Sequence, residues 1–332
     1  HAYNVGIGYT AGGAVTTGVE NVLIGGLAGD ALTDADYNIA IGQSALSADT
    51  NGSKSIAIGR QALQSQNMSS ALDTHNIAIG YQSQGSSTTA LNNIAIGTIS
   101  LFTNTTGRKN IAIGKGALQT FNVTDSSDTN NIGIGFEAGK QLTTGIRNIL
   151  IGGVAGDAIT DADGNVAMGH SALSSNTVGS YSVALGFRAL NNQNPSSATD
   201  MYNTAVGTDA GTSVTTGVRN TLMGGLTGDA LTTGRDNIAI GYLALSSETA
   251  SDNSVAIGSH CLQNQNNTSN TDVYNVAVGY NAGNTITTGA SNTLIGGLTG
   301  DALTTGTLNT AVGRSALGSD TTGGRAVAIG YP

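Results

Sequence analysis

One five-residue phrase recurs along the whole chain, from Asn4 to Gly330, and is seen in its commonest form at Asn38-Ile39-Ala40-Ile41-Gly42. The glycines that close successive copies are always 17 or 21 residues apart. A fixed period with one short β-rich phrase is typical of a solenoid, in which each repeat forms a coil stacked on its neighbours. We therefore predict an all-β fold, a parallel β-solenoid (β-roll) of about 19 coils that spans 1–332 as a single repeat domain.

The phrase predicts a short strand, because its second and fourth residues, such as Ile111 and Ile113, are β-branched and share one pleat face. The closing glycine predicts a bend that needs positive φ or a close neighbouring coil. An apolar pair such as Ala45-Leu46 predicts a second strand in the coil. A turn such as Thr16-Thr17-Gly18 often follows, and we expect its glycine to take the left-handed conformation.

The spacings are themselves ordered, because three gaps of 17 and one of 21 form a block of 72 residues. The second block is 17 residues shorter and lacks the coil that carries a glycine pair, such as Gly25-Gly26. Leucine at the third place of the phrase occurs only in coils with that pair. The blocks span about 9–80, 81–135, 136–207 and 208–279, with a partial one at 280–330.

Asparagine opens most copies of the phrase, and Ser55, Ser182 and Ser254 fill the same place in three copies. Stacked coils place these residues one above another. We therefore expect the amides to form a ladder of side-chain hydrogen bonds beside the backbone ladder.

The 21-residue coils carry four extra residues, within 67–75, 122–130, 194–202 and 266–274, which we expect to bulge from one edge. A row of loops on a stiff scaffold is suited to contact with a partner; tolerated insertion without function is the alternative. The candidate receptor-contact residues in these loops are Asn67, His75, Asn122, Asn194, Tyr202, Asn266 and Tyr274.

Charge and composition exclude several classes of partner. The net charge is −9 and the basic residues are scattered, which argues against binding nucleic acid or anionic lipid. No apolar run approaches the ~20 residues needed to cross a bilayer, so we expect no membrane insertion. The one cysteine, Cys261, excludes internal disulfides, and alanine at the same place in other coils indicates a small buried residue.

The chain shows none of the residue patterns that carry catalysis or bind a cofactor. His1, His75, His170 and His260 lack metal-ligand spacing, which favours solvated or coil-edge positions, and no nucleophile elbow or phosphate loop is present. The pairs Asp34/Asp36 and Asp161/Asp163 suggest a weak Ca²⁺ site, but threonine replaces the first aspartate in later blocks. We therefore expect no enzymatic activity, no cofactor and no metal; an acyltransferase or a polysaccharide-cleaving solenoid is the alternative with least support.

Copies such as Ser182-Val183-Ala184-Leu185-Gly186 resemble the head repeat of YadA-like trimeric autotransporter adhesins. Coils with the Thr-Thr-Gly turn, as at 287–296, are similar to repeats of phage tail-fibre proteins. The resemblance covers the whole chain. It implies a left-handed roll, a homotrimer and an extracellular place on a virion or cell surface.

The strands also predict a trimer without the resemblance, because both of their faces are apolar and need two covers. Leu150 points away from the pleat face of Ile149 and Ile151, and we expect a sister chain to cover it. The expected trimer seam consists of Leu23, Leu150, Leu222 and Leu294.

These features favour a structural and adhesive fibre segment, most simply part of a phage tail fibre that contacts a host glycan or protein. The head of a bacterial trimeric adhesin is the alternative, and an ice- or surface-binding solenoid with threonine rows is an alternative of another class. The repeat is in phase at both ends of the sequence, so we expect flanking fibre domains to cover the end coils.

Overall fold

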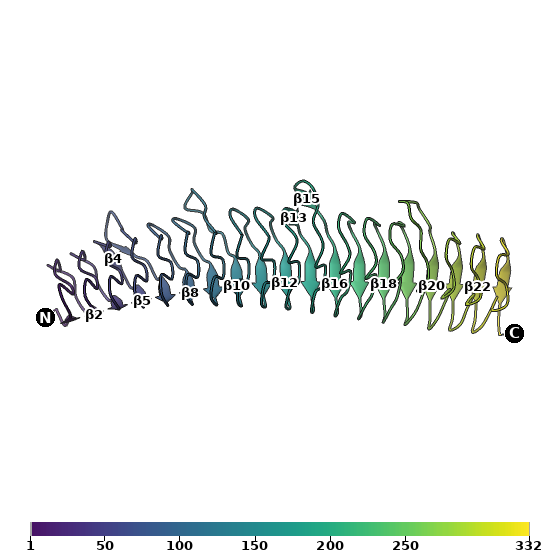
Figure 1. The fold of residues 1–332 in the computed structure, drawn as a ribbon, viewed down its shortest axis with the longest axis horizontal. Coiled ribbons are helices and arrows are strands. Elements are labelled where there is room, and N and C mark those ends of the chain that lie inside the picture. The colour runs from purple at the N-terminus through teal and green to yellow at the C-terminus, as the bar shows by residue number, and fades with distance from the viewer. Residues whose placement is uncertain (1, 332) are drawn as a thin grey trace. The chain divides into compact units, whose positions relative to one another are not determined.

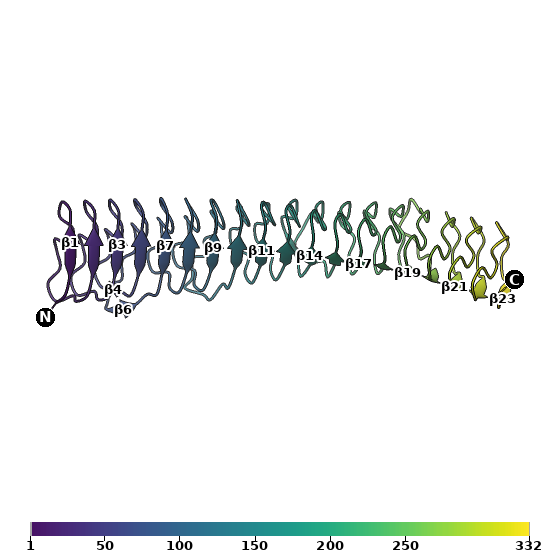
Figure 2. The same cartoon turned by 90° about the horizontal axis from the view of Figure 1, so that it is seen from below.

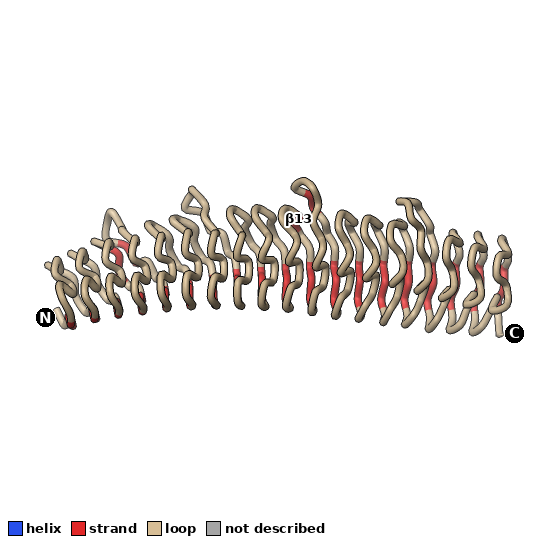
Figure 3. Tube along the Cα trace, viewed as in Figure 1, coloured by secondary structure: helices blue, strands red, loops and turns tan. Residues whose placement is uncertain are grey.

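The computed structural model describes residues 2–331 and confirms the predicted fold class: these residues form a parallel β-solenoid and contain no helix (Figures 1 and 3). Each coil carries one three-residue strand; four coils carry an additional two-residue strand, and the rest of each coil is turns and loops. The chain divides into two compact units, one up to Gly164 and one from Asn165 onward. This division falls inside the block at 136–207.

The strands of each unit lie side by side and in register, so that equivalent residues of successive copies face one another, as Ile39 faces Ile56 (Figure 2). The strands of the first unit are β1 (Val5–Ile7), β2 (Val22–Ile24), β3 (Ile39–Ile41), β5 (Ile56–Ile58), β7 (Ile77–Ile79), β8 (Ile94–Ile96), β9 (Ile111–Ile113), β10 (Ile132–Ile134) and β11 (Ile149–Ile151). Those of the second are β12 (Val166–Met168), β14 (Val183–Leu185), β16 (Thr204–Val206), β17 (Thr221–Met223), β18 (Ile238–Ile240), β19 (Val255–Ile257), β20 (Val276–Val278), β21 (Thr293–Ile295), β22 (Thr310–Val312) and β23 (Val327–Ile329).

The middle residue of the strand, and not the isoleucine pair, faces the core. Ala40 and Ala57 are fully buried, whereas the residues on either side of them are only half-buried. The leucines expected at a trimer seam lie in the same inward row and are at most 1% exposed in the single chain. Their assignment to the seam is therefore wrong: Leu23, Leu150, Leu222 and Leu294 are core residues.

Core volume explains why leucine occupies the middle of some strands. We number the places of a coil from the residue that opens the phrase. Ordinary coils combine alanine at place three with leucine at place nine, as in Ala57 and Leu63. A coil with leucine at place three has glycine at place nine. The coil that precedes it along the chain also has glycine at place nine. For Leu150 these glycines are Gly156 and Gly139, where a Cβ would lie 2.8 and 2.6 Å from its methyl carbons. Alanine at place three with leucine at place nine, and leucine at place three with glycine at place nine, are therefore two ways of filling the same narrow core.

The phrase glycine meets both conditions expected of it. Gly42 has φ of 130°, and a Cβ there would lie 2.6 Å from the carbonyl oxygen of Gly59 in the next coil. Gly18 of the Thr-Thr-Gly turn does not take the left-handed conformation. This place requires glycine because a Cβ would collide with the carbonyl oxygen of Ala35. The expected second strand is also wrong: Ala45-Leu46 lies in a turn, with φ of 53° at Leu46.

The asparagine ladder is confirmed, and its main rung is a bond from side chain to backbone. Oδ1 of Asn21 accepts a hydrogen bond from the backbone N–H of Asn38 (2.9 Å), and Nδ2 of Asn21 donates to the carbonyl of Ala35 in its own coil (2.7 Å). Every such asparagine side chain that has coils on both sides is buried. The amide thus joins consecutive coils and closes its own coil.

Where serine replaces asparagine, a buried glutamine from place twelve of the same coil continues the network. Gln66 donates to Ser55 Oγ (3.1 Å) and accepts from Nδ2 of Asn76 (2.9 Å). Gln193 and Gln265 make the corresponding contacts to the asparagines of their next coils. A short side chain and a long one together take the role of the missing amide.

Candidate functional site: the loops of the long coils

The four extra residues of each long coil form a loop that stands above the turns of neighbouring coils, as predicted (Figure 1). The returning segment pairs with the preceding coil. In the first long coil β6 (Leu72–Asp73) pairs with β4 (Gly52–Ser53), and in the third β15 (Thr199–Asp200) pairs with β13 (Gly179–Ser180). Single bridges, Arg108 to Asp128 and Asp252 to Asp272, do the same in the other two. The loops are therefore anchored at their bases.

The four asparagines predicted to contact a receptor attach the loops to the coil below through hydrogen bonds. The Oδ1 atoms of Asn67, Asn122, Asn194 and Asn266 accept hydrogen bonds from the hydroxyls of Thr50, Thr105, Thr177 and Thr249, at 2.7 to 3.1 Å. Each threonine lies 17 residues earlier, in the coil below. The carbonyl half of each amide therefore holds the loop in place.

The other three candidates, His75, Tyr202 and Tyr274, are exposed and close the long coils at positive φ. The Tyr202 ring stacks on that of Tyr181 in the preceding coil, with centroids 5.7 Å apart and planes at 10°. Tyr274 has no stacked partner among the described residues. The structure thus brings Tyr202 into an aromatic pair that the sequence reasoning did not identify.

Sequence reasoning also missed an aspartate at the same place of every long coil. Asp73 and Asp128 form ion pairs with Lys54 and Lys109, each at 2.6 Å. The third and fourth loops lack a lysine there, and Asp200 and Asp272 accept hydrogen bonds from the hydroxyls of Tyr202 and Tyr274. Alignment of the four long coils on their opening residue would have shown this column.

A hollow lies beside the second loop, with a volume of about 420 Å³. This volume falls within the ~300 to 1,000 Å³ of small-molecule sites. The loop forms one wall and the next coil the other, and the lining residues are Asn122, Val123, Thr124, Asp125, Ser127, Thr144 and Ile146. Asn122 is thus the predicted contact residue that borders a concave surface.

Two buried carboxylates support the first and fourth loops from the coil below. Asp49 accepts hydrogen bonds from the backbone N–H groups of Gly52 and Met68. Glu248 accepts from three successive backbone N–H groups, those of Thr249, Ala250 and Ser251, and from Gln265. Burial alone would raise the pKa of Glu248, but these hydrogen bonds outweigh it and hold the pKa below its ordinary value. Both carboxylates are structural.

Other groups with reactive or metal-binding chemistry are used by the scaffold. Oδ1 of Asp36 accepts the backbone N–H of Val19, and Oδ1 of Asp163 that of Ile146. Within residues 2–331 no three His, Cys, Asp or Glu side chains lie close enough to hold a metal ion together. Cys261 is buried as predicted, and burial raises the pKa of its thiol to about 12.

His75 and His170 are exposed, and His260 is half-buried at the coil edge between the rings of Tyr242 and Tyr280. These positions agree with the predicted coil-edge placement. His1 lies outside the described residues.

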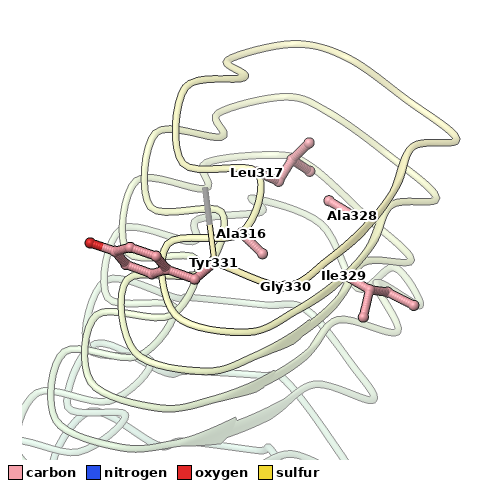
Figure 4. A pocket seen from close by; sticks show the side chains of 6 residues that line it. All are labelled: Ala316, Leu317, Ala328, Ile329, Gly330 and Tyr331. Carbon is pink, nitrogen blue, oxygen red and sulfur yellow. The ribbon is translucent and has the colours of Figure 1, made fainter.

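A smaller hollow at the last coil is lined by Ala316, Leu317, Ala328, Ile329, Gly330 and Tyr331 (Figure 4). Its volume of about 210 Å³ is below that of typical ligand sites. Ile329 and Tyr331 point outward from the coil in Figure 4. The other lining residues are apolar, so no polar side chains converge on this hollow.

The outward strand face is a second candidate surface. In each unit the residues that flank the buried middle position form two parallel rows, which are apolar except for Thr204, Thr221, Thr293 and Thr310 in the second unit. Met168, Met223 and Ile295 in these rows are 41 to 42% exposed. Contiguous exposed apolar surface is a feature of contact sites in general, which makes this face a candidate.

No protein-family model matches this chain, and no curated protein matches it either. No part of residues 2–331 is a helix long and apolar enough to cross a bilayer. The site is therefore interpreted from its own geometry.

Proposed function

We propose that this chain is a structural and adhesive fibre segment, part of a phage tail fibre that contacts the host surface, and that it acts as a homotrimer. The observation that carries the proposal is the outward strand face. Its rows of isoleucine, valine, methionine and threonine are only half-buried, while the inward face is complete with alanine and leucine. A strand that is apolar on both faces needs a second cover, and sister chains supply it most simply.

The trimer seam in this proposal lies on the isoleucine rows and not on the leucines. A parallel ladder grows perpendicular to its strands, coil upon coil, without a size limit, which suits a shaft. The loops of the long coils stand away from the outward strand face and remain free to meet a host glycan or protein. The virion, outside the cell, is the location that goes with this role.

The resemblance of Ser55-Ile56-Ala57-Ile58-Gly59 and its equivalents to adhesin head repeats supports a second candidate, the head of a bacterial trimeric surface adhesin. Both candidates use the same trimer and the same loops. An ice-binding role has less support, because the threonine hydroxyls of the turn are engaged along the stack. Thr16 and Thr232, for example, donate to the carbonyls of Thr33 and Thr249 in the next coils.

The test shortens all four long coils to 17 residues and measures attachment of the fibre to its native host cells. The four asparagines that hold the loops are replaced by threonine, the residue that ordinary coils have at that place, so that the shortened coils stack. We expect the fold to persist by circular dichroism and attachment to fall at least tenfold. Undiminished attachment would contradict an adhesive role for the loops and leave this segment a spacer.

A further inference from the structure

We propose that Tyr181, Tyr202 and Asp200 form a binding site for a neutral pyranose sugar at the base of the third loop. The proposal deepens the proposed function, on which it rests, by naming one loop and one ligand class. Tyr181 ends the coil that carries β13, and Tyr202 ends the long coil that carries β15 (Figure 1). Both side chains are exposed, at 41% and 53%.

The aromatic pair presents flat apolar surface to solvent. Its rings are nearly parallel, with centroids 5.7 Å apart. Rings in van der Waals contact at about 3.5–4 Å can have so large a centroid separation only if they are displaced sideways, which is the preferred offset arrangement. With Tyr181 41% and Tyr202 53% exposed, both side chains leave part of their surface open to solvent. A ring face is electron-rich, and the C–H groups on one side of a pyranose are its natural complement.

The carboxylate of Asp200 supplies the polar part of the site. Its Oδ2 accepts a hydrogen bond from the Tyr202 hydroxyl at 3.1 Å, and Asp200 is exposed. Among the described residues it has no cation partner. A carboxylate accepts several hydrogen bonds, so Asp200 can hold Tyr202 in place and still receive sugar hydroxyls.

The backbone around the three residues is fixed before any ligand arrives. β13 pairs with β15 through Gly179–Thr199 and Ser180–Asp200. The N–H of Met201 donates to Ser180 at 3.0 Å, and the N–H of Arg219 in the next coil donates to Met201 at 2.8 Å. Binding to such a site orders little additional chain, which favours affinity.

The other long coils show why the third loop is selected. At the places of Tyr181 and Tyr202 the first has Lys54 and His75, and the second has Lys109 and Asn130; each lysine neutralises the local aspartate. The fourth long coil has a single tyrosine, whose hydroxyl bonds Asp272, with Asn253 below it. Only the third loop combines two stacked rings with an aspartate free of a cation.

Charge decides between neutral and acidic sugars. Asp200 repels a carboxylated or sulfated sugar, and the whole chain carries a net charge of −9. Arg219, the next residue along the column of coil ends, forms a bidentate ion pair with Asp236 at 2.6 and 2.8 Å. Its charge is already compensated, so it does not recruit anions. The site therefore favours neutral hexoses and N-acetylhexosamines.

The test uses saturation-transfer NMR on the intact chain with methyl glycosides of glucose, galactose, mannose, N-acetylglucosamine and N-acetylgalactosamine, and with those of glucuronic and sialic acids. We expect transfer to at least one neutral glycoside and none to the acidic ones. Tyr181→Lys and Tyr202→Asn each introduce the residue that the second long coil has at that place, which protects the fold. Each should weaken binding at least tenfold, whereas the matched control Tyr274→Asn should leave it unchanged.

No transfer to any neutral glycoside, stronger transfer to the acidic ones, or equal loss in the Tyr274→Asn control would overturn the assignment. Attachment to host cells is measured on the same variants. If loop shortening abolishes attachment but no neutral glycoside binds, the proposed function stands and this site does not. If a glycoside binds through Tyr202 but attachment survives loop shortening, the site stands and the adhesive role fails.

Discussion

Leu150 occupies space that a side chain on Gly156 would need: a Cβ at Gly156 would lie 2.8 Å from Cδ2 of the leucine. The two residues belong to one coil and are six positions apart. In ordinary coils the leucine at place nine fills this volume, and the residue at place three is alanine. The pair is therefore one packing unit with two solutions.

We predict that Leu150→Ala lowers the free energy of unfolding by about 2–5 kcal/mol because of the cavity it leaves. Gly156→Leu alone costs about 1–3 kcal/mol or more through overpacking. The double variant matches an ordinary coil and should recover most of the loss, although Gly139 in the coil below stays unfilled. Urea unfolding of the single and double variants measures the coupling. Strictly additive losses would contradict the exchange.

Removing one amide of the ladder should be costly. In Asn275→Ala, the backbone N–H of Asn292 loses its acceptor at 2.9 Å, and the backbone carbonyl of Gly289 and the side-chain Oε1 of Gln265 lose a donor. A buried polar group left unpaired costs about 1–3 kcal/mol, so we expect a loss of at least 2 kcal/mol in urea unfolding. The control is Asn264→Ala, on an exposed side chain, and should change stability by less than about 0.5 kcal/mol.

Glu248 should make stability depend on pH. Its pKa is lower in the folded chain than in the unfolded one, so its contribution is present above the unfolded pKa of about 4.3 and is lost as pH falls through the folded pKa. Glu248→Gln removes one charged acceptor and should cost about 1.5–3 kcal/mol at pH 7. The difference from the native chain, measured by urea unfolding from pH 7 to pH 3, should shrink in acid. A constant difference would refute this role.

Cys261 should be unreactive in the folded chain. With a pKa of about 12, roughly one thiol in ten thousand is ionised at pH 8, and Sγ lies against the carbonyl of Ala277 at 3.1 Å. We expect labelling by a thiol-specific disulfide reagent only in denaturant. Cys261→Ala, which introduces the residue found at that place in neighbouring coils, should cost less than about 1.5 kcal/mol. Rapid labelling of the native chain would show that this coil opens.

The outward strand face should hold three chains together. Sedimentation equilibrium should give three times the chain mass of 33.0 kDa, and Ile94→Asp should reduce it to one, because carboxylates would be forced into an apolar seam. The control Thr89→Asp alters an exposed turn residue of the preceding coil and should leave the mass unchanged. A native chain that sediments as a monomer would disprove the trimer.

The sequence predicted the features that depend on period. Register follows from the 17- and 21-residue spacing, so the strands, the amide ladder at Asn38 and its equivalents, and the positions of the loops were all accessible. The inward pleat face was not, because isoleucine on one side and alanine or leucine on the other are both apolar. We expected the larger residues inside, but a 17-residue coil is so narrow that alanine fits its core.

The loop chemistry was only partly accessible from sequence. Asn67 and its equivalents are polar and lie in insertions, which predicts exposure, but their bonds to threonine arise from stacking 17 residues apart. The pairing of Tyr181 with Tyr202 was hidden for a related reason. The two tyrosines are 21 residues apart, and only the coil length brings their rings together.

Gln84 marks the place in the short block where the leucine coil is missing. In every complete block the coil that precedes the leucine coil has glycine at place nine; in the short block that place is Gln84, which is buried and whose Nε2 donates to the carbonyl of Ile77. Its Oε1 has no hydrogen-bond partner within residues 2–331, so the replacement fills volume better than it satisfies polarity. A single coil therefore cannot be deleted or duplicated freely, since its leucine and its neighbour's glycine must be gained or lost together. Losing or adding a leucine coil is therefore coupled to place nine of the coil before it, whose residue has to change as well, as Gln84 shows.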